Sequence, residues 1–238
     1  MKFIQSWQYT IMGTSCAIAL MLTHVSLPAH AQSFAGTGSA GSSTKGGSRG
    51  SCPSTGKPLT PLVPASAPNG GWTMSANPTF WVYVPYTLTP EHTVEFVLLD
   101  DQNQLHYQTR FAGTGSTPGI LGLSLPAKAT PLDEGKVYTW YVMVYCDRQG
   151  DLPASASATI QRVPVDATLK QQLAKASPLE QSRLYANRRL WYDALTVLST
   201  ARLTPNSQAT TAWRALLTLP TVALQSFIAE PVQLAPTP

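Results

Sequence analysis

Residues 136–146, which read Lys-Val-Tyr-Thr-Trp-Tyr-Val-Met-Val-Tyr-Cys, are the stretch of sequence that decides the fold. Successive side chains of a β-strand point to opposite faces, so every second residue lies on the same face. One face of this stretch carries Tyr138, Trp140, Val142, Val144 and Cys146. We therefore expect a long strand with one apolar face, which ends in a cysteine on the side of the core aromatics.

The turn before this strand also indicates the fold. Leu132, Gly135 and Tyr138 fit the spacing L-x-x-G-x-x-Y. The spacing resembles the turn into the sixth strand of fibronectin type III and related sandwiches, where a tyrosine hydroxyl ties the corner to the backbone. On either side, β-rich runs at 79–84, 94–98, 105–111 and 119–125 alternate with turn signals. We expect an antiparallel β-sandwich over residues 52–165, Ig-like or fibronectin III-like, with a hairpin around 100–104.

Beyond residue 165 the apolar period changes from two to about 3.6, which indicates helices. Asp166 is placed to cap a first helix, and Ser177-Pro178-Leu179-Glu180 combines a capping box with proline at the first helical position. Apolar stripes at 191–201 and 209–217 predict two more helices. The overall expectation is an α+β chain with a small helical unit at 166–230 and a disordered tail at 231–238.

One helix pair in this unit has a more specific spacing. Tyr185, Ala194, Leu198 and Ala201, with Pro205 closing, lie near the spacing of a tetratricopeptide (TPR) repeat. A single repeat cannot bury its own apolar face, and the sequence shows no second copy. We expect a TPR-like helix pair packed on the sandwich, with a simple helical appendage as the other interpretation.

The amino-terminal segment predicts export. Lys2, an apolar stretch at 11–27 and the small residues Ala29 and Ala31 make up a signal peptide over residues 1–31, with an uncleaved anchor as the alternative. Residues 32–51 are rich in Gly and Ser and predict a flexible tether, whose Lys45 and Arg49 offer weak attachment to an anionic surface. The protein is expected in the periplasm or outside the cell, with no transmembrane segment after cleavage.

Of the three cysteines, Cys16 lies in the signal peptide. The remaining pair, Cys52 and Cys146, favours a disulfide because compartments outside the cytoplasm are oxidising. Two separate buried thiols remain the alternative. We expect no metal site, because these cysteines and the histidines His92 and His106 lack the close spacing of zinc ligands.

Composition and motifs argue against several classes of function. The net charge is +4 and the cations are scattered, which disfavours a nucleic-acid partner. Glycine-rich matches to nucleotide-binding and nucleophile motifs fall in or just after the tether, without the strand and helix that such sites require. We therefore expect no cofactor and assign no catalytic residue.

Two groups of residues are candidates for recognition or chemistry. Aromatic rings stack on sugars and anchor interfaces, and the candidates are Trp72, Trp81, Tyr83 and Tyr86. A pair of carboxylates hydrolyses glycosides when it flanks the bond, and the candidates are Asp100, Asp101, Asp133, Glu134 and Asp147. The alternatives are that the aromatic rings lie in the core and that the carboxylates lie on solvated turns.

Several segments carry a resemblance to a known family. They are the run Pro-Thr-Phe-Trp-Val-Tyr-Val-Pro-Tyr at 78–86 and the segments at 134–140, 146–147, 184–186 and 191–195. With Cys52, they resemble a secreted cyanobacterial family known only as domain of unknown function 928 (DUF928), over roughly residues 52–228. The resemblance implies export and supports pairing of the two cysteines. It implies no activity, ligand or catalytic residue.

The sequence thus predicts an exported, non-catalytic module that binds an unknown envelope protein or a glycan. The alternative is a hydrolase of cell-wall or exopolysaccharide that uses a carboxylate pair.

Overall fold

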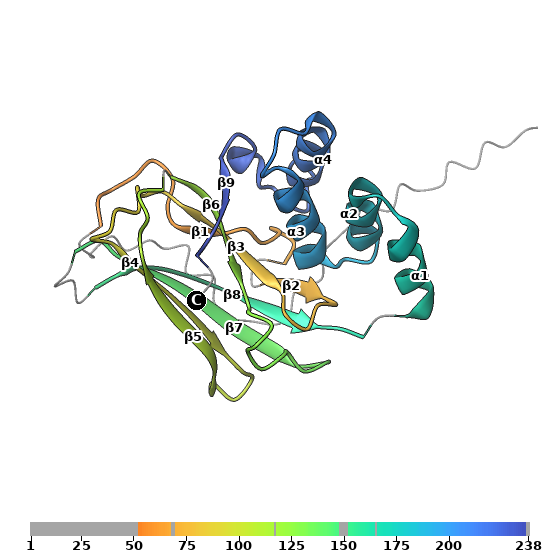
Figure 1. Ribbon diagram of the computed structural model, residues 1–238, viewed down its shortest axis with the longest axis horizontal. Helices are drawn as coiled ribbons and strands as arrows, with labels where there is room; N and C mark the ends of the chain where they lie inside the picture. Colours follow the sequence, from red (N-terminus) through yellow and green to blue (C-terminus); the bar gives the residue numbers. More distant parts are fainter. Residues whose placement is uncertain (1–51, 68–69, 117, 148–151, 165, 237–238) are drawn as a thin grey trace, which may run out of the picture. The chain divides into compact units, whose positions relative to one another are not determined.

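The computed structural model describes residues 52–67, 70–116, 118–147, 152–164 and 166–236. The predicted signal peptide and tether lie outside these residues. All the described residues belong to one compact unit, Ala31–Pro238. Two β-sheets and four α-helices make it an α+β fold, as the sequence predicts (Figure 1).

The larger sheet has five strands in the order β2-β8-β7-β4-β5. Its strands are β2 (Gly70–Thr73), β8 (Ala154–Arg162), β7 (Val137–Tyr145), β4 (Thr93–Leu99) and β5 (Leu105–Ala112). Strands β4 and β5 form the expected antiparallel hairpin, and β7 pairs with both β4 and β8. The strand predicted over 136–146 therefore lies in the middle of the sheet.

The smaller sheet has four strands in the order β1-β3-β6-β9. Its strands are β1 (Thr60–Pro61), β3 (Thr79–Val84), β6 (Gly119–Ser124) and β9 (Val232–Leu234). Strand β9 corrects the expected disordered tail, because residues 232–234 add to the edge of β6. This edge offers unpaired backbone groups, which the three residues satisfy.

The expectation of purely antiparallel sheets is also wrong. Strands β2 and β8 pair parallel, as do β6 and β9. Parallel neighbours need a long connection, whereas a tight hairpin gives antiparallel ones. Both parallel pairs join segments far apart in the chain, so the hairpin-based expectation did not apply to them.

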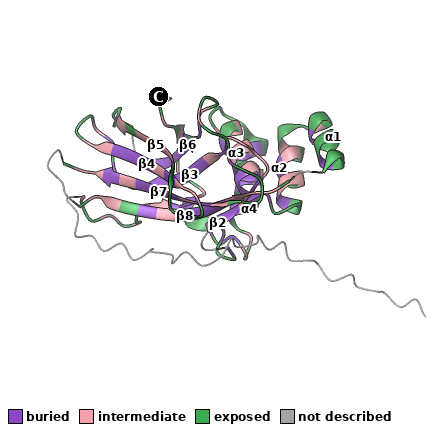
Figure 2. Cartoon of the chain, turned by 90° about the horizontal axis from the view of Figure 1, so that it is seen from below, coloured by how far each residue is buried: buried purple, intermediate pink, exposed green. Residues whose placement is uncertain are grey.

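The two sheets share one apolar core. The ring of Phe80 on β3 lies 4.9 Å from that of Phe96 on β4 and 5.5 Å from that of Trp140 on β7, centroid to centroid. Buried and half-buried residues alternate along β7, whereas β3 and β6 are buried over almost their whole length (Figure 2). The predicted corner is present, since the Asp133 amide donates a hydrogen bond of 3.0 Å to the Tyr138 hydroxyl.

The helical elements are α1 (Ala167–Lys175), α2 (Pro178–Asn187), α3 (Trp191–Ala201), α4 (Ser207–Leu217) and the short 3-10 helix η1 (Gln225–Phe227). Both predicted caps are present: Asp166 accepts from the Leu169 amide, and Ser177 and Glu180 form the capping box. Helix α1 buries only Leu169 and Leu173 and is otherwise largely exposed (Figure 2). None of the helices in the described residues is long and apolar enough to cross a membrane.

Helix α3 is fixed to both sheets. The indole Nε1 of Trp191 donates to the Leu62 carbonyl at 2.8 Å. The Tyr192 hydroxyl donates to the Thr159 carbonyl and accepts from Trp140 Nε1, each at 2.8 Å. Because these buried groups are all satisfied, α3 is held firmly and positions the helices on either side of it.

Candidate functional site

A groove runs between α2 and α4, with α3 beneath it. Its volume is about 490 Å³, within the range of pockets that accept ligands. Its lining comprises Leu179, Ser182, Arg183, Ala186, Asn187, Leu198, Ser207, Gln208, Thr211, Ala212, Ala215, Leu216 and Leu219. We call this surface the helical groove.

Small side chains leave the helical groove open. Ser182 and Ala186 lie one turn apart on α2, and Ala212 and Ala215 occupy the facing side of α4. Leu198, buried on α3, contributes to the lining between them. Larger residues at the alanine positions would fill this space, because side chains three or four apart on a helix share a face.

The helical groove carries one charge, that of Arg183. No acidic side chain lines the groove, and Arg183 forms no ion pair with any described residue. Glu180, one turn earlier, is directed back to the helix start, where the Ser177 amide and hydroxyl both donate to it at 2.8 Å. These bonds, and to a smaller extent the charge of Arg183, lower the pKa of Glu180. An apolar groove with a cation that lacks a close ion-pair partner suits an apolar ligand with a carboxylate.

The aromatic residues predicted to stack on a ligand lie mainly in the core. Trp81 is 1% exposed, and its Nε1 donates to the Thr196 hydroxyl at 3.0 Å. Tyr83 packs against Phe227, and Tyr86 is 9% exposed. Trp72 packs with the cluster around Leu169 and Leu173. For Trp81, Tyr83 and Tyr86 the expectation of a surface stack is corrected, because these rings are buried. Thr196 of α3 contacts Trp81, and Phe227 of η1 packs against Tyr83.

The candidate carboxylates lie on turns. Asp100 accepts from the Gln102 and Gln104 amides at 2.9 and 2.8 Å and thereby shapes the β4–β5 turn, where Asp101 is exposed. In the corner before β7, Asp133 pairs with Lys136 at 3.1 Å and Glu134 pairs with Arg162 at 3.4 Å. Asp147 is exposed just after β7. None of these carboxylates lines the helical groove.

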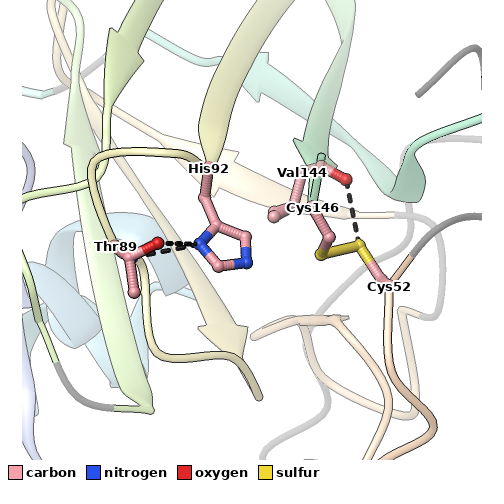
Figure 3. Close-up of a disulfide and its surroundings, with 5 residues drawn as sticks. All are labelled: Cys52, Thr89, His92, Val144 and Cys146. Carbon is pink, nitrogen blue, oxygen red and sulfur yellow. Dashed lines mark hydrogen bonds between the residues drawn. A yellow bond between two sulfur atoms is a disulfide. The ribbon is translucent and has the colours of Figure 1, made fainter. Parts of the chain in front are cut away.

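The predicted disulfide is present between Cys52 and Cys146 (Figure 3). It ties the segment before β1 to the end of β7, across a sequence separation of 94 residues. The Cys52 sulfur lies 3.3 Å from the Val144 carbonyl oxygen. A bridged sulfur has no hydrogen to donate, so this approach is a packing contact.

The two histidines make local contacts. His92 Nδ1 accepts from the Thr89 amide at 3.1 Å and lies 2.8 Å from the Thr89 hydroxyl (Figure 3). His106 Nε2 lies 2.9 Å from the Thr130 carbonyl, and its ring meets Tyr138 edge-on. Within the described ranges, no three residues of the metal-binding types come together.

A carboxylate that sequence reasoning missed lies where α3 meets the strands. Asp193 Oδ2 accepts from the Met74 amide at 3.1 Å, beside a cavity of about 130 Å³ that Tyr185, Tyr192 and Thr196 also line. Burial raises the pKa of Asp193 to about 7, although the nearby amides and the Thr73 hydroxyl oppose that shift. The only sequence signal was an acidic residue in the first turn of a helix, which is common.

A second missed carboxylate, Glu95, lies on the outer face of the larger sheet. It accepts from Arg110 Nη2 and the Tyr145 hydroxyl at 2.9 Å each, and also from Gln108 Nε2. Burial alone would raise the pKa of Glu95, but the three donors lower it overall. The partners come from β5 and β7, so the network fastens three neighbouring strands.

Comparison of the sequence with known proteins gives a family match. The family model described as Domain of Unknown Function (DUF928) matches residues 44–232. No curated protein matches the sequence. A solved structure, "Crystal Structure of Parabacteroides merdae Beta-Glucuronidase (GUS)", is 8% identical with a TM-score of 0.25. The match covers 64% of this chain and 26% of that one, and at such a score it carries no argument.

Proposed function

Because the chain belongs to the DUF928 family, whose description assigns no activity, we propose its function from the geometry of the helical groove. The protein is an exported, non-catalytic module of the cell envelope or extracellular space. It binds a protein partner through an amphipathic segment that carries apolar side chains and at least one carboxylate.

The observation that carries this proposal is Arg183 at an apolar groove, where its charge interacts with Glu180 but forms no ion pair with a described residue. Apolar side chains of the partner are buried against Leu198 and Leu216, and its carboxylate pairs with the guanidinium. A groove without acidic side chains favours an acidic partner over a basic one. A protein segment also suits a groove bounded by two helices, since amphipathic segments bind such surfaces through regularly spaced apolar residues.

Other features support the proposal from outside the groove. The signal-like sequence at 1–31 and the disulfide are both typical of proteins in oxidising compartments. We also propose that the two sheets form an Ig-like or fibronectin III-like sandwich, a comparison supported by the Tyr138 corner. Helices α2 and α3 then correspond to the TPR-like pair.

The test is to select binders from a random peptide library displayed on phage, with the purified protein immobilised. We expect enriched peptides that combine Asp or Glu with large apolar residues. Ala215→Trp fills the groove from α4, and Arg183→Glu reverses its charge, so each variant should lose these peptides by at least tenfold. Both side chains lie on the groove wall, so the fold is retained.

Matched controls separate the groove from the rest of the surface. Thr210→Trp adds the same side chain to α4 outside the groove, and Lys175→Glu reverses a charge on α1. Both controls should bind the selected peptides as the unmodified protein does. The proposal is wrong if no peptide is enriched, or if the enriched peptides bind Ala215→Trp and Arg183→Glu unchanged.

A further inference from the structure

Strand β5 forms the outer edge of the larger sheet. It pairs with β4 on one side, and no described strand lies on its other side (Figure 1). It has eight residues, of which 107–112 pair regularly with β4, beyond a register shift at Leu98/Leu99. It contains no proline or lysine, and its outward side chains Gln108 and Arg110 are exposed. Native proteins usually shield an edge strand by placing proline or lysine in it or by keeping it very short, because its free backbone groups attract another strand.

The backbone groups that face outward can be assigned from the register. The Gly113 amide donates to the His92 carbonyl at 2.9 Å, which makes residues 92 and 113 a hydrogen-bonded pair with β4. Hydrogen-bonded and non-hydrogen-bonded pairs alternate along antiparallel strands. Phe111, Thr109 and Tyr107 therefore bond toward β4, while the amides and carbonyls of Gln108, Arg110 and Ala112 face the free edge.

From this edge we propose that two copies of the chain pair antiparallel through β5, centred on Thr109, to form one continuous sheet. In this register Gln108 of each copy faces Arg110 of the other, and the two pairs exchange four backbone hydrogen bonds. On the inner face, Tyr107 lies opposite Phe111 of the second copy, and the two Thr109 side chains meet at the twofold axis.

The sequence of β5 fits this register. Aromatic pairs and threonine pairs are among the favourable cross-strand combinations, and no like charges face one another. A register shifted by one pair, centred on Gln108, would place His106 opposite Arg110 and Tyr107 opposite Thr109. Tyr107 and Phe111 are only partly buried in the single chain, so pairing covers more of their surface.

The occupant is a second copy, since each side chain of β5 finds a suitable partner within β5 itself. The contact is small, of the class that forms weak or transient complexes. It leaves the helical groove free, so it does not depend on the proposed function. The dimer would present two grooves and strengthen binding to a partner with two segments.

Sedimentation velocity of the purified protein, from low micromolar to near-millimolar concentration, tests the proposal with two opposite substitutions. Gln108→Glu places a carboxylate opposite Arg110 twice in the dimer, where each Arg110 also pairs with Glu95 of its own chain. Gln108→Lys places a cation there. We expect the dimer dissociation constant to fall about fivefold with Glu and to rise about fivefold with Lys, given two exposed charge pairs.

The same substitutions act in the opposite sense on the single chain. Gln108 donates to Glu95, so a glutamate at 108 repels Glu95 and a lysine attracts it. At low protein concentration, Gln108→Lys should therefore have a higher unfolding temperature than Gln108→Glu. In dimerisation the order is reversed, and Gln108→Glu should have the higher affinity. A common effect on folding cannot produce both orders.

Cross-linking fixes the register. Directly opposite residues of a non-hydrogen-bonded pair have Cα atoms about 4.5 Å apart, within disulfide range. Thr109→Cys should give a covalent dimer under mild oxidation, with the native bridge intact by mass. Gln108→Cys should give little covalent dimer under the same conditions. A monomer at every concentration, equal responses to Glu and Lys, or cross-linking only through position 108 would each overturn the proposal.

Discussion

The carboxyl group of Asp193 should make the protein less stable as the pH rises toward neutrality. Its pKa is raised from an ordinary 3.8 to about 7 in the folded chain, chiefly by burial. Between these values the folded state holds a proton that the unfolded state releases. The contribution to stability is therefore complete below pH 3.8 and is lost progressively until about pH 7.

The size of the effect follows from the shift. A difference of about three pH units corresponds to roughly 4 kcal/mol, at about 1.4 kcal/mol per unit. That figure is an upper value, because the adjoining cavity of about 130 Å³ is open enough to reduce desolvation. We expect a loss of about 2 to 4 kcal/mol in the free energy of unfolding from pH 4 to pH 8.

The assay is urea unfolding followed by tryptophan fluorescence, for the unmodified protein and Asp193→Asn across this pH range. The amide does not ionise, so the free energy of unfolding of the variant should rise by about 2 to 4 kcal/mol relative to that of the unmodified protein between pH 4 and pH 8. Asp166→Asn is the opposite control, since the Leu169 amide and Arg188 lower the pKa of Asp166. The reasoning would be refuted if the difference in unfolding free energy between Asp193→Asn and the unmodified protein did not change with pH.

Two further predictions concern packing and the disulfide. The oxidised protein should weigh two hydrogens less than its reduced form, and replacing Cys52 and Cys146 by serine should cost about 2 to 5 kcal/mol of unfolding free energy; two thiols alkylated without denaturant would contradict this. Gly122→Ala should cost about 1 to 3 kcal/mol in thermal or urea unfolding, because its added carbon would meet the Trp81 ring at 2.6 Å. Gly56→Ala, where the added carbon meets nothing within 4 Å, should be neutral, and equal losses for both would show the packing argument to be wrong.

The elements that the sequence predicted well are those with local causes. The helix start at Pro178 follows from Ser177 and Glu180, whose reciprocal hydrogen bonds lie within one turn. The corner at Tyr138 is similarly local, since its hydroxyl reaches an amide only five residues away. Such signals need no knowledge of distant partners, which is why they could be assigned from one sequence.

Strand β8 shows why other elements were missed. Its sequence, Ala-Ser-Ala-Ser-Ala-Thr-Ile-Gln-Arg, contains mostly residues with little intrinsic preference for strands. It is held by eight paired positions on β7, of which Val137↔Gln161 and Val144↔Ala154 are the ends. The helical groove was missed for a related reason, because small residues on α2 and α4 form a groove only when α3 sets their separation.

The placement of Trp81 depends on both local sequence and distant residues. Its sequence context, an aromatic run ending in proline, does not distinguish a binding surface from a core. The decisive residues lie far away: Gly122 on β6 has no side chain and leaves room for the ring, and Thr196 on α3 accepts its indole hydrogen. An aromatic ring with its polar atom satisfied and its face covered is held in place, so it stabilises the junction between sheet and helices. The surfaces that we propose for recognition are therefore the helical groove and the β5 edge, the latter through its backbone groups together with Tyr107 and Phe111.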